Sequence, residues 1–398
     1  MGERRAARAA GMDIPTLFFA AAGIAAAAAL PFVRVRPNRI ADGVARLLAQ
    51  VDPAAAAVLV ALWAVAGAAA IIHMSASARA TAAELVSIGA ALCAIVAAGL
   101  VTARLSGADT VARISLSTGF WATTIIGYAS FLSVSRRPSP GKGLGRRVLG
   151  FSIPVLVGVL LFSGVLDAVS VMREWAVQKT VFFAETKTHL VLAGIAVLAG
   201  GLLGIVIGVV SVRSAAVRRI AFFVLNIVQT IPSLALFGLL ILPLAALSRR
   251  FPLLHEWGIS GIGRAPAIFA LSFYAMLPIA RNTYTALAQI PASLRDAGRG
   301  MGMTRGQLLA RVEMPLALPL ILAGIRTASV QAVGNTVVAA LIGAGGLGIF
   351  IFQGLGQYAA DMILLGTLPV IAMAVIIDML MGGLVRLITP KPLREAAA

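Results

Sequence analysis

Long apolar runs alternate with short polar and often basic segments along most of this chain. The apolar runs are continuous rather than alternating, which favours membrane helices over the strands of a barrel. Because a helix needs about 20 mostly apolar residues to cross a bilayer, we predict an all-α, polytopic membrane protein with about ten transmembrane helices. The predicted spans are 14–33, 54–73, 83–103, 114–134, 149–170, 189–211, 220–247, 265–283, 316–342 and 363–386.

Composition and charge agree with that class. The 398 residues are 60% hydrophobic, and the net charge is +18. The arginines lie between the spans, as the positive-inside bias predicts, so nucleic acid is not an expected partner. Placing both termini in the cytoplasm puts more Lys and Arg inside than outside, and residues 282–315 are then cytoplasmic. We expect a multi-pass membrane protein. The histidines are scattered, so no metal site is expected.

A basic, Pro- and Gly-rich segment at 135–147 divides the chain. Residues 1–135 are predicted to form a four-span region, without a motif that indicates chemistry. Residues 136–188 would hold the linker, a fifth span and a polar outer loop at 171–188. Residues 189–390 would form a second membrane region, which contains a cytoplasmic loop at 284–314.

Within that loop, residues 291–315 cannot lie in a membrane although apolar spans flank them on both sides. Pro291 and Ser293 predict a short helix over 293–300, with Asp296 in its first turn, where the helix dipole favours an anion. Gly302 would let the backbone turn. A second helix would then run from Thr304 to the start of the next span. A solvated loop with incidental charges is the simpler interpretation, and a helix that docks on a partner is the sharper one.

The spacing within this loop resembles the EAA loop of ATP-binding-cassette (ABC) importer permeases. Asp296 stands where that motif has Glu, Gly298 where it has the second Ala, and Gly302 at its glycine. The resemblance implies that the loop couples the permease to a separate ATPase subunit. The residues that would carry this coupling are Arg295, Asp296, Ala297, Gly298, Arg299, Gly302 and Pro315. Arg295 and Arg299 share one helical face, either as cytoplasmic retention charges or as contacts to an acidic rim of the ATPase.

Other stretches resemble one branch of these permeases, which imports osmoprotectants such as glycine betaine. TIPSLALFG (230–238) and GAGGLG (343–348) carry that resemblance in residues 189–386. PNRIADG (37–43) and ARISLSTGFW (112–121) resemble the long permeases of the low-affinity betaine-uptake type, which have extra N-terminal spans. GAGGLG also fits a dinucleotide fingerprint, but it follows a membrane span, so we interpret it as a tight turn with close helix packing.

The resemblance implies a type I ABC importer permease core in a bacterial inner membrane, and a set of partners. Two ATPase subunits would bind ATP and Mg²⁺, a periplasmic or lipid-anchored binding protein would deliver the solute, and a second permease, identical or different, would complete the pathway. This chain has no phosphate-binding G-x-x-x-x-G-K-[ST] motif, so we expect no enzyme activity and no cofactor in it. The alternatives are an ABC permease for another small polar solute, such as an amino acid, and a secondary transporter, which would need inverted repeats.

Polar residues within the spans are the candidates for the transport pathway. Asn226, Gln229 and Ser233 surround the proline that interrupts the seventh span, and their spacing places them on one face. Gln331 and Asn335 lie one turn apart in the ninth span. These five residues would either line the pathway or hydrogen-bond between helices. Arg326 and Asp378 are the intramembrane charges. They would pair with each other, or Asp378 would reach the interface alone, and a structural ion pair is favoured over a role in gating. Neither is expected to bind the ammonium group of a zwitterion, because the resemblance implies that selection rests mainly with the binding protein.

Overall fold

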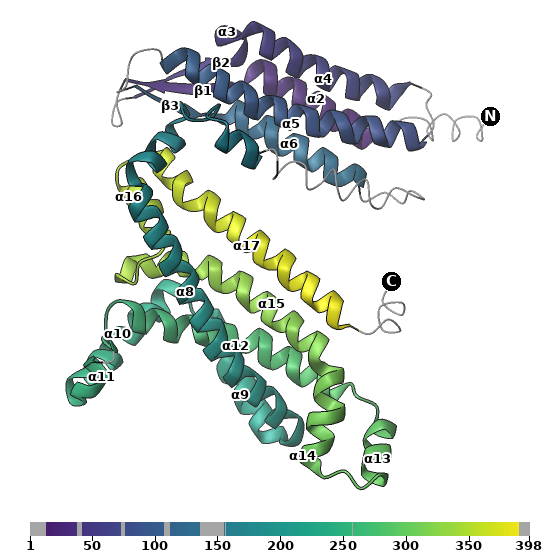
Figure 1. The fold of residues 1–398 in the computed structure, drawn as a ribbon, viewed down its shortest axis with the longest axis vertical. Coiled ribbons are helices and arrows are strands. Elements are labelled where there is room, and N and C mark those ends of the chain that lie inside the picture. Colours follow the sequence, from purple (N-terminus) through teal and green to yellow (C-terminus); the bar gives the residue numbers. More distant parts are fainter. Residues whose placement is uncertain are drawn as a thin grey trace. The chain divides into compact units, whose positions relative to one another are not determined.

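The computed structural model describes residues 13–37, 42–72, 76–106, 112–135, 155, 157–256 and 258–389. Helix dominates, as the apolar pattern predicts, and the chain divides into two compact units (Figure 1). The N-terminal unit comprises Met1–Val177 and Gln357–Asp361, and the core unit comprises Gln178–Gly356 and Met362–Ala398. The short segment 357–361 therefore belongs to the N-terminal unit, although the chain on either side of it belongs to the core.

The N-terminal unit is built on four long helices, α2 (Ile14–Ala29), α4 (Pro53–Ile71), α5 (Ala76–Ser106) and α6 (Thr118–Ser135). Helix α2 packs on α4 and α6, and α5 packs on α4 and α6, so the four close into a bundle. Its core is rich in alanine, with Trp63 and Leu59 fully buried. Asp52 caps α4, because its carboxylate accepts a hydrogen bond from the Ala55 backbone N–H at 3.0 Å.

A small antiparallel sheet, absent from the predicted spans, joins these helices. It consists of β1 (Pro31–Arg36), β2 (Val44–Leu47) and β3 (Arg113–Leu116) in the order β2-β1-β3. The spans predicted at 14–33 and 114–134 therefore overrun into strands at one end each. Residues 33–36 read Val-Arg-Val-Arg, a period-two alternation that a search for 20-residue apolar runs passes over. The motif at 112–121 includes β3, and the described ends of the motif at 37–43 adjoin β1 and β2; residues 38–41 fall outside the described part.

Helix α8 (Ser170–Arg213) corrects the polar loop predicted at 171–188. The polarity of the segment predicts a loop, but polar residues also form helices outside the hydrocarbon of the membrane. The helix has non-helical backbone angles at Gln178 (φ −104°, ψ 16°), at the boundary between the two units. The predicted fifth span is also too long, since residues 163–169 form turns and bends; most of its first half lies outside the described residues.

The core unit packs α8 on α12 (Arg264–Ala288), and α12 in turn on α9 (Ala215–Thr230), α10 (Ser233–Arg250) and α15 (Met314–Ala339). Gly200, Gly204 and Gly208 lie four residues apart on α8 and let α12 approach closely. A Cβ at Gly204 would lie 3.0 Å from the Met276 carbonyl oxygen and one at Gly200 only 2.5 Å from that of Ser272. Such stripes of small residues are typical of helix pairs in membranes. The unit also contains α11 (Pro252–Glu256), α16 (Gly348–Gly356) and α17 (Ala360–Ile388).

Six helical stretches among the described residues are long and apolar enough to cross a membrane. They are Pro53–Ile71, Ala78–Ser106, Ser170–Arg213, Ser233–Arg250, Arg305–Ile342 and Ala360–Ile388, and Ile14–Ala29 is a shorter apolar helix. The protein is thus a polytopic helical membrane protein, whereas the number of ten spans stays a prediction.

Candidate functional site

The loop between α12 and α15 contains a short helix, α13 (Ala292–Gly300), which matches the predicted 293–300 within a residue. In Figure 1, α13 lies at one end of the core unit, apart from the long helices. Pro291 precedes its first turn. One detail of the prediction was wrong: Asp296 lies beyond the first turn, and its exposed carboxylate pairs with Arg299 at 3.3 Å. The local partner of the Asp296 carboxylate is therefore the Arg299 guanidinium, and not the N-terminal end of the helix dipole.

Arg295 and Arg299 share a helix but have different surroundings. The Arg295 Nε donates to Glu313 Oε1 at 2.7 Å, and its Nη2 donates to the Leu287 carbonyl at 2.5 Å. Arg295 therefore ties α13 to the end of α12 and to the start of the next span. The Arg299 side chain is 65% exposed, which leaves its guanidinium accessible to a partner.

Two glycines shape the loop for different reasons. Gly298 is buried, and a Cβ there would lie 2.6 Å from Leu308 Cδ1, so the position needs a small residue. Gly302 has φ +79° with open space around it, so the position needs the left-handed conformation that glycine adopts without strain. The Gly302 N–H bonds the Arg299 carbonyl at 2.9 Å and closes the end of α13.

The return to the membrane is continuous, which differs from the separate second helix that the sequence predicted. The side chains of Thr304 and Gln307 form a capping box at the start of α14 (Arg305–Leu308). A π-helical turn, η1 (Leu309–Glu313), then leads directly into α15. Pro315 lies in the first turn of α15, where its missing N–H and its ring are tolerated because of the wider turn before it.

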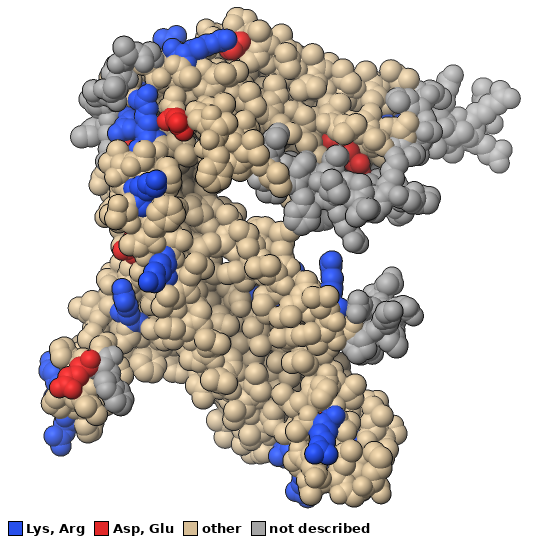
Figure 2. Space-filling model, viewed as in Figure 1, with Lys and Arg blue, Asp and Glu red and all other residues tan. Residues whose placement is uncertain are grey.

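The outer face of α13 exposes two large apolar side chains. Leu294 is 44% exposed and Met301 is 71% exposed, and their spacing of seven residues puts them on one side of the helix with Ala297. Beside them is a hollow of about 380 Å³, lined by Val212, Arg213, Arg295, Arg299, Arg305, Leu308 and Glu313. Figure 2 shows Lys and Arg side chains over the end of the core unit where α13 and α14 lie. Exposed apolar side chains beside arginines are features that protein interfaces share.

The predicted break in the seventh span is present between α9 and α10 at Ile231 and Pro232. Tyr274 on α12 makes two hydrogen bonds at the end of α9 next to this break. The Gln229 Nε2 donates to the Tyr274 carbonyl at 2.7 Å, and the Tyr274 hydroxyl donates to the Ile231 carbonyl, one of the carbonyls left free at the end of α9. Tyr274 was not among the candidate residues, although it follows the broken span in the sequence.

The five pathway candidates come together in part. The Gln331 Nε2 lies 3.5 Å from Gln229 Oε1, so the two groups of candidates meet through one residue each, across α9 and α15. Asn226 is exposed, and its Nδ2 bonds the Phe222 carbonyl of its own helix at 2.6 Å. Ser233 and Asn335 are half-buried. The Gln229 side chain hydrogen-bonds to another helix, and the Gln331 side chain is exposed. The prediction that these residues line the transport pathway therefore stays a prediction.

The GAGGLG segment forms the tight turn that its glycines predicted. Gly343, Gly345 and Gly346 have φ values of +75°, +87° and +91°. Two residues of α8 hold this turn. Glu185 Oε2 accepts from the Gly346 N–H at 2.6 Å, and His189 Nδ1 accepts from the Leu347 N–H at 3.3 Å. Neither residue was a candidate: Glu185 lies in the segment 171–188 that was predicted to be a loop, and His189 begins a predicted span without a partner that the sequence indicates.

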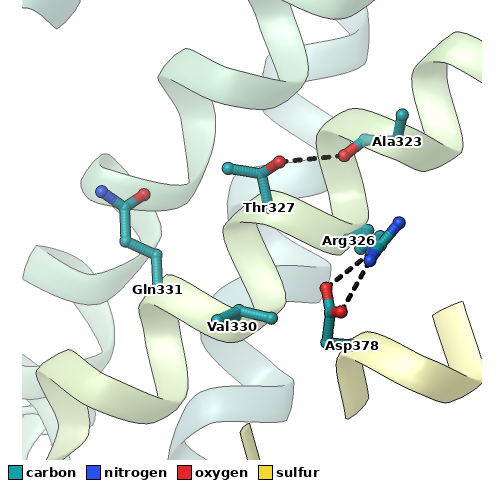
Figure 3. Close-up of a pocket in the computed structure, with 6 residues that line it drawn as sticks. All are labelled: Ala323, Arg326, Thr327, Val330, Gln331 and Asp378. Atoms are coloured by element: carbon teal, nitrogen blue, oxygen red, sulfur yellow. Dashed lines mark hydrogen bonds and ion pairs between the residues drawn. The ribbon is translucent and has the colours of Figure 1, made fainter. Parts of the chain in front are cut away.

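Arg326 on α15 and Asp378 on α17 form the predicted ion pair. Nε meets Oδ1 and Nη2 meets Oδ2, each at 2.6 Å, which is a bidentate geometry. The two side chains are 41% and 43% exposed. With Ala323, Thr327, Val330 and Gln331 they line a hollow of about 520 Å³ (Figure 3).

Comparison with known proteins defines the class. Residues 200–394 match the family described as "Binding-protein-dependent transport system inner membrane component", and residues 13–172 match "ABC transporter permease YehY, N-terminal domain". The chain belongs to the permease components of binding-protein-dependent ABC transport systems. The second match also supports the N-terminal resemblance, which rested on the motifs that flank the sheet.

Individual relatives narrow the branch to osmoprotectant permeases. The chain is 39% identical to the carnitine transport permease protein OpuCB of Listeria monocytogenes over 53% of this chain and 90% of that protein. It is 40% identical to the glycine betaine/carnitine/choline permease OpuCB of Bacillus subtilis (53% and 89%). It is 42% identical to the osmoprotectant import permease OsmW of Salmonella typhimurium (52% and 92%).

Proposed function

We propose that this permease mediates ATP-driven uptake of glycine betaine or a related quaternary amine across the inner membrane of a bacterium. The observation that carries the proposal is the match of the core to permeases for carnitine, glycine betaine and choline over nearly their whole length. The match of residues 13–172 to the YehY N-terminal domain supports a long permease of this kind. Both termini are proposed to lie in the cytoplasm, on the side to which the loop at 284–314 belongs.

In this proposal α13 couples the permease to a separate ATPase subunit, which binds ATP and Mg²⁺ and performs the hydrolysis. Leu294 and Met301 would enter an apolar groove of the ATPase, and Arg299 would meet its acidic rim. The bonds of Arg295 support the role, because they make the loop a rigid lever between α12 and α15. ATPase closure would then move both spans together, in a two-state change between inward- and outward-facing forms.

Further partners complete the proposed importer. A second permease, either another copy of this chain or a related one, would form the pathway with it. A periplasmic or lipid-anchored binding protein would supply the solute. A second candidate substrate class is another small polar solute such as an amino acid, since the loop motif occurs across ABC permeases regardless of what they carry.

The test is reconstitution. The permease is placed in proteoliposomes with the ATPase and binding protein encoded beside it, and ATP-dependent uptake of labelled glycine betaine is measured. Uptake that requires all three proteins is the expected result. ATP hydrolysis stimulated by the binding protein without betaine uptake would move the proposal to another solute. Failure of the ATPase to associate would contradict the role given to α13.

A further inference from the structure

We propose that the Arg326–Asp378 pair is a binding site for the solute itself, for a zwitterion that has a carboxylate and a quaternary ammonium group. The inference rests on the proposed function and adds a step to it. The permease would recognise the solute within the membrane, after the binding protein has released it. The sequence alone favoured a purely structural ion pair at this place, whereas the geometry of the pair indicates a binding site.

The exposure of the pair is the first observation. A pair that served only to join α15 to α17 would be enclosed between them, because charges in a membrane are costly where they are not shielded. Both side chains are instead about two-fifths exposed and line an open hollow. Figure 3 shows the guanidinium reaching from α15 to the carboxylate on α17 at the side of this hollow. Charged groups that face such a hollow are accessible to a charged solute.

The unused donors of Arg326 are the second observation. A guanidinium has five N–H donors, and Asp378 occupies donors on Nε and Nη2. In the part of the chain that the structure describes, the Nη1 amino group is left for an incoming carboxylate. Gly382 makes room for this arrangement, since a Cβ there would lie only 3.2 Å from Arg326 Cζ and Nη1.

The negative partner suits the other end of the solute. A quaternary ammonium has no N–H and forms no hydrogen bond, so it needs a nearby negative charge and contacts for its methyl groups. Asp378 supplies the charge, and Ala323 and Val330 supply apolar contacts in the same hollow. Thr327 does not compete for the carboxylate as a donor, because its hydroxyl already bonds the Ala323 carbonyl at 3.1 Å.

The two charges together predict selectivity. A zwitterion laid across the pair places its carboxylate at Arg326 and its ammonium at Asp378, and the net charge of the hollow stays unchanged. A quaternary amine without a carboxylate, such as choline, would bring a positive charge to the hollow and leave the Arg326 Nη1 group without an acceptor. The site should therefore favour glycine betaine over choline.

The first test replaces the pair by neutral groups of similar shape, Arg326→Gln with Asp378→Asn. The full complex in proteoliposomes is supplied with labelled glycine betaine or labelled choline, and the ratio of their initial uptake rates is compared with wild type, so that the selectivity of the binding protein cancels. We expect the ratio to fall at least about tenfold, as for the loss of one charge-assisted hydrogen bond. An unchanged ratio would mean that the pair only joins the helices and would overturn the proposal.

The second test needs no substitution of the charges. Cys93 is the single cysteine, so Cys93→Ser allows a Thr327→Cys variant to be labelled with an anionic thiol reagent. Glycine betaine should slow this labelling, and choline should not. Ser329→Cys is the matched control, since the Ser329 hydroxyl also bonds a carbonyl four residues earlier, at 2.8 Å, but Ser329 does not line the hollow. Equal labelling of Thr327→Cys with and without glycine betaine would contradict the site.

The labelling uses the permease–ATPase complex without binding protein, so it is independent of uptake. Protection by glycine betaine without wild-type uptake would keep the site and remove the proposed function. Wild-type uptake without protection would keep the function and remove the site.

Discussion

Helix α17 has one aspartate in each of the two units, and the two have different environments. Asp361 belongs to the N-terminal unit and is 6% exposed. Its Oδ2 accepts from Ser115 Oγ of β3 at 3.2 Å and from Ser170 Oγ of α8 at 2.5 Å. Asp378 belongs to the core unit, is 43% exposed, and is held by a guanidinium beside an open hollow. The first carboxylate fastens a chain segment, and the second remains accessible.

This contrast clarifies the role of the N-terminal unit. A second contact joins the sheet to the same chain segment as Asp361: the Arg36 guanidinium of β1 donates a hydrogen bond to the Tyr358 carbonyl at 3.4 Å. The sheet thus holds the connector between α16 and α17, and that connector follows directly on the GAGGLG turn and α16. We infer that the sheet serves to fix this connector, whereas the polar groups of the core on which the two proposals rest are accessible.

The largest expected effect is at the buried aspartate. Asp361→Ala leaves two buried hydroxyls without their acceptor, so we expect the free energy of unfolding of the N-terminal unit to fall by about 1–3 kcal/mol. Denaturant unfolding in detergent measures it. Asp167→Ala is the control, since Asp167 is an exposed acidic residue of the same unit. If both variants unfold alike, the fastening role of Asp361 is wrong.

A smaller effect is expected at Gly302, where the backbone conformation, and not a side-chain contact, requires glycine. Gly302→Val forces a β-branched residue to adopt φ +79° and should destabilise the coupling loop by about 1–2 kcal/mol, weakening ATPase binding. Gly302→Asn should retain most of the binding, because asparagine tolerates this conformation and the surrounding space is open. Affinity of the ATPase for the two variants, measured in detergent, checks the order. Equal loss in both would show that Gly302 contacts the partner directly.

The smallest effect separates the two loop arginines. Arg295→Ala removes hydrogen bonds to Glu313 and to the Leu287 carbonyl and should loosen the loop by about 1 kcal/mol, which hydrogen exchange of α13 would report. Arg299→Ala should leave that exchange unchanged within about 0.5 kcal/mol, since Arg299 is exposed. Its effect should appear in ATPase binding instead. Faster exchange in both variants would remove the distinction.

The structure confirms sequence predictions mainly where the signal is local. The α13 helix, the turn at Gly302 and the break at Pro232 each depend on a proline or glycine and its neighbours in sequence. The predictions failed where polarity was equated with a loop, at 171–188, and where an apolar run hid an alternation, at 31–36. Polarity alone cannot separate a loop from an exposed helix, and an apolar run alone cannot separate a membrane helix from a short strand that follows it.

The sequence by itself determined the class of protein, because apolar runs of bilayer length and the spacing of the coupling loop are properties of the chain alone. The sequence also predicted that Arg326 pairs with Asp378, because charged side chains within a membrane are stabilised by an opposite charge. Only the tertiary structure decided that Asp361 is buried against Ser115 and Ser170, that Glu185 and His189 hold the GAGGLG turn, and that the Arg326–Asp378 pair faces a hollow. These facts depend on which helices pack together, and burial is a property of that packing, so residues far apart in sequence acquire their roles only in the folded chain.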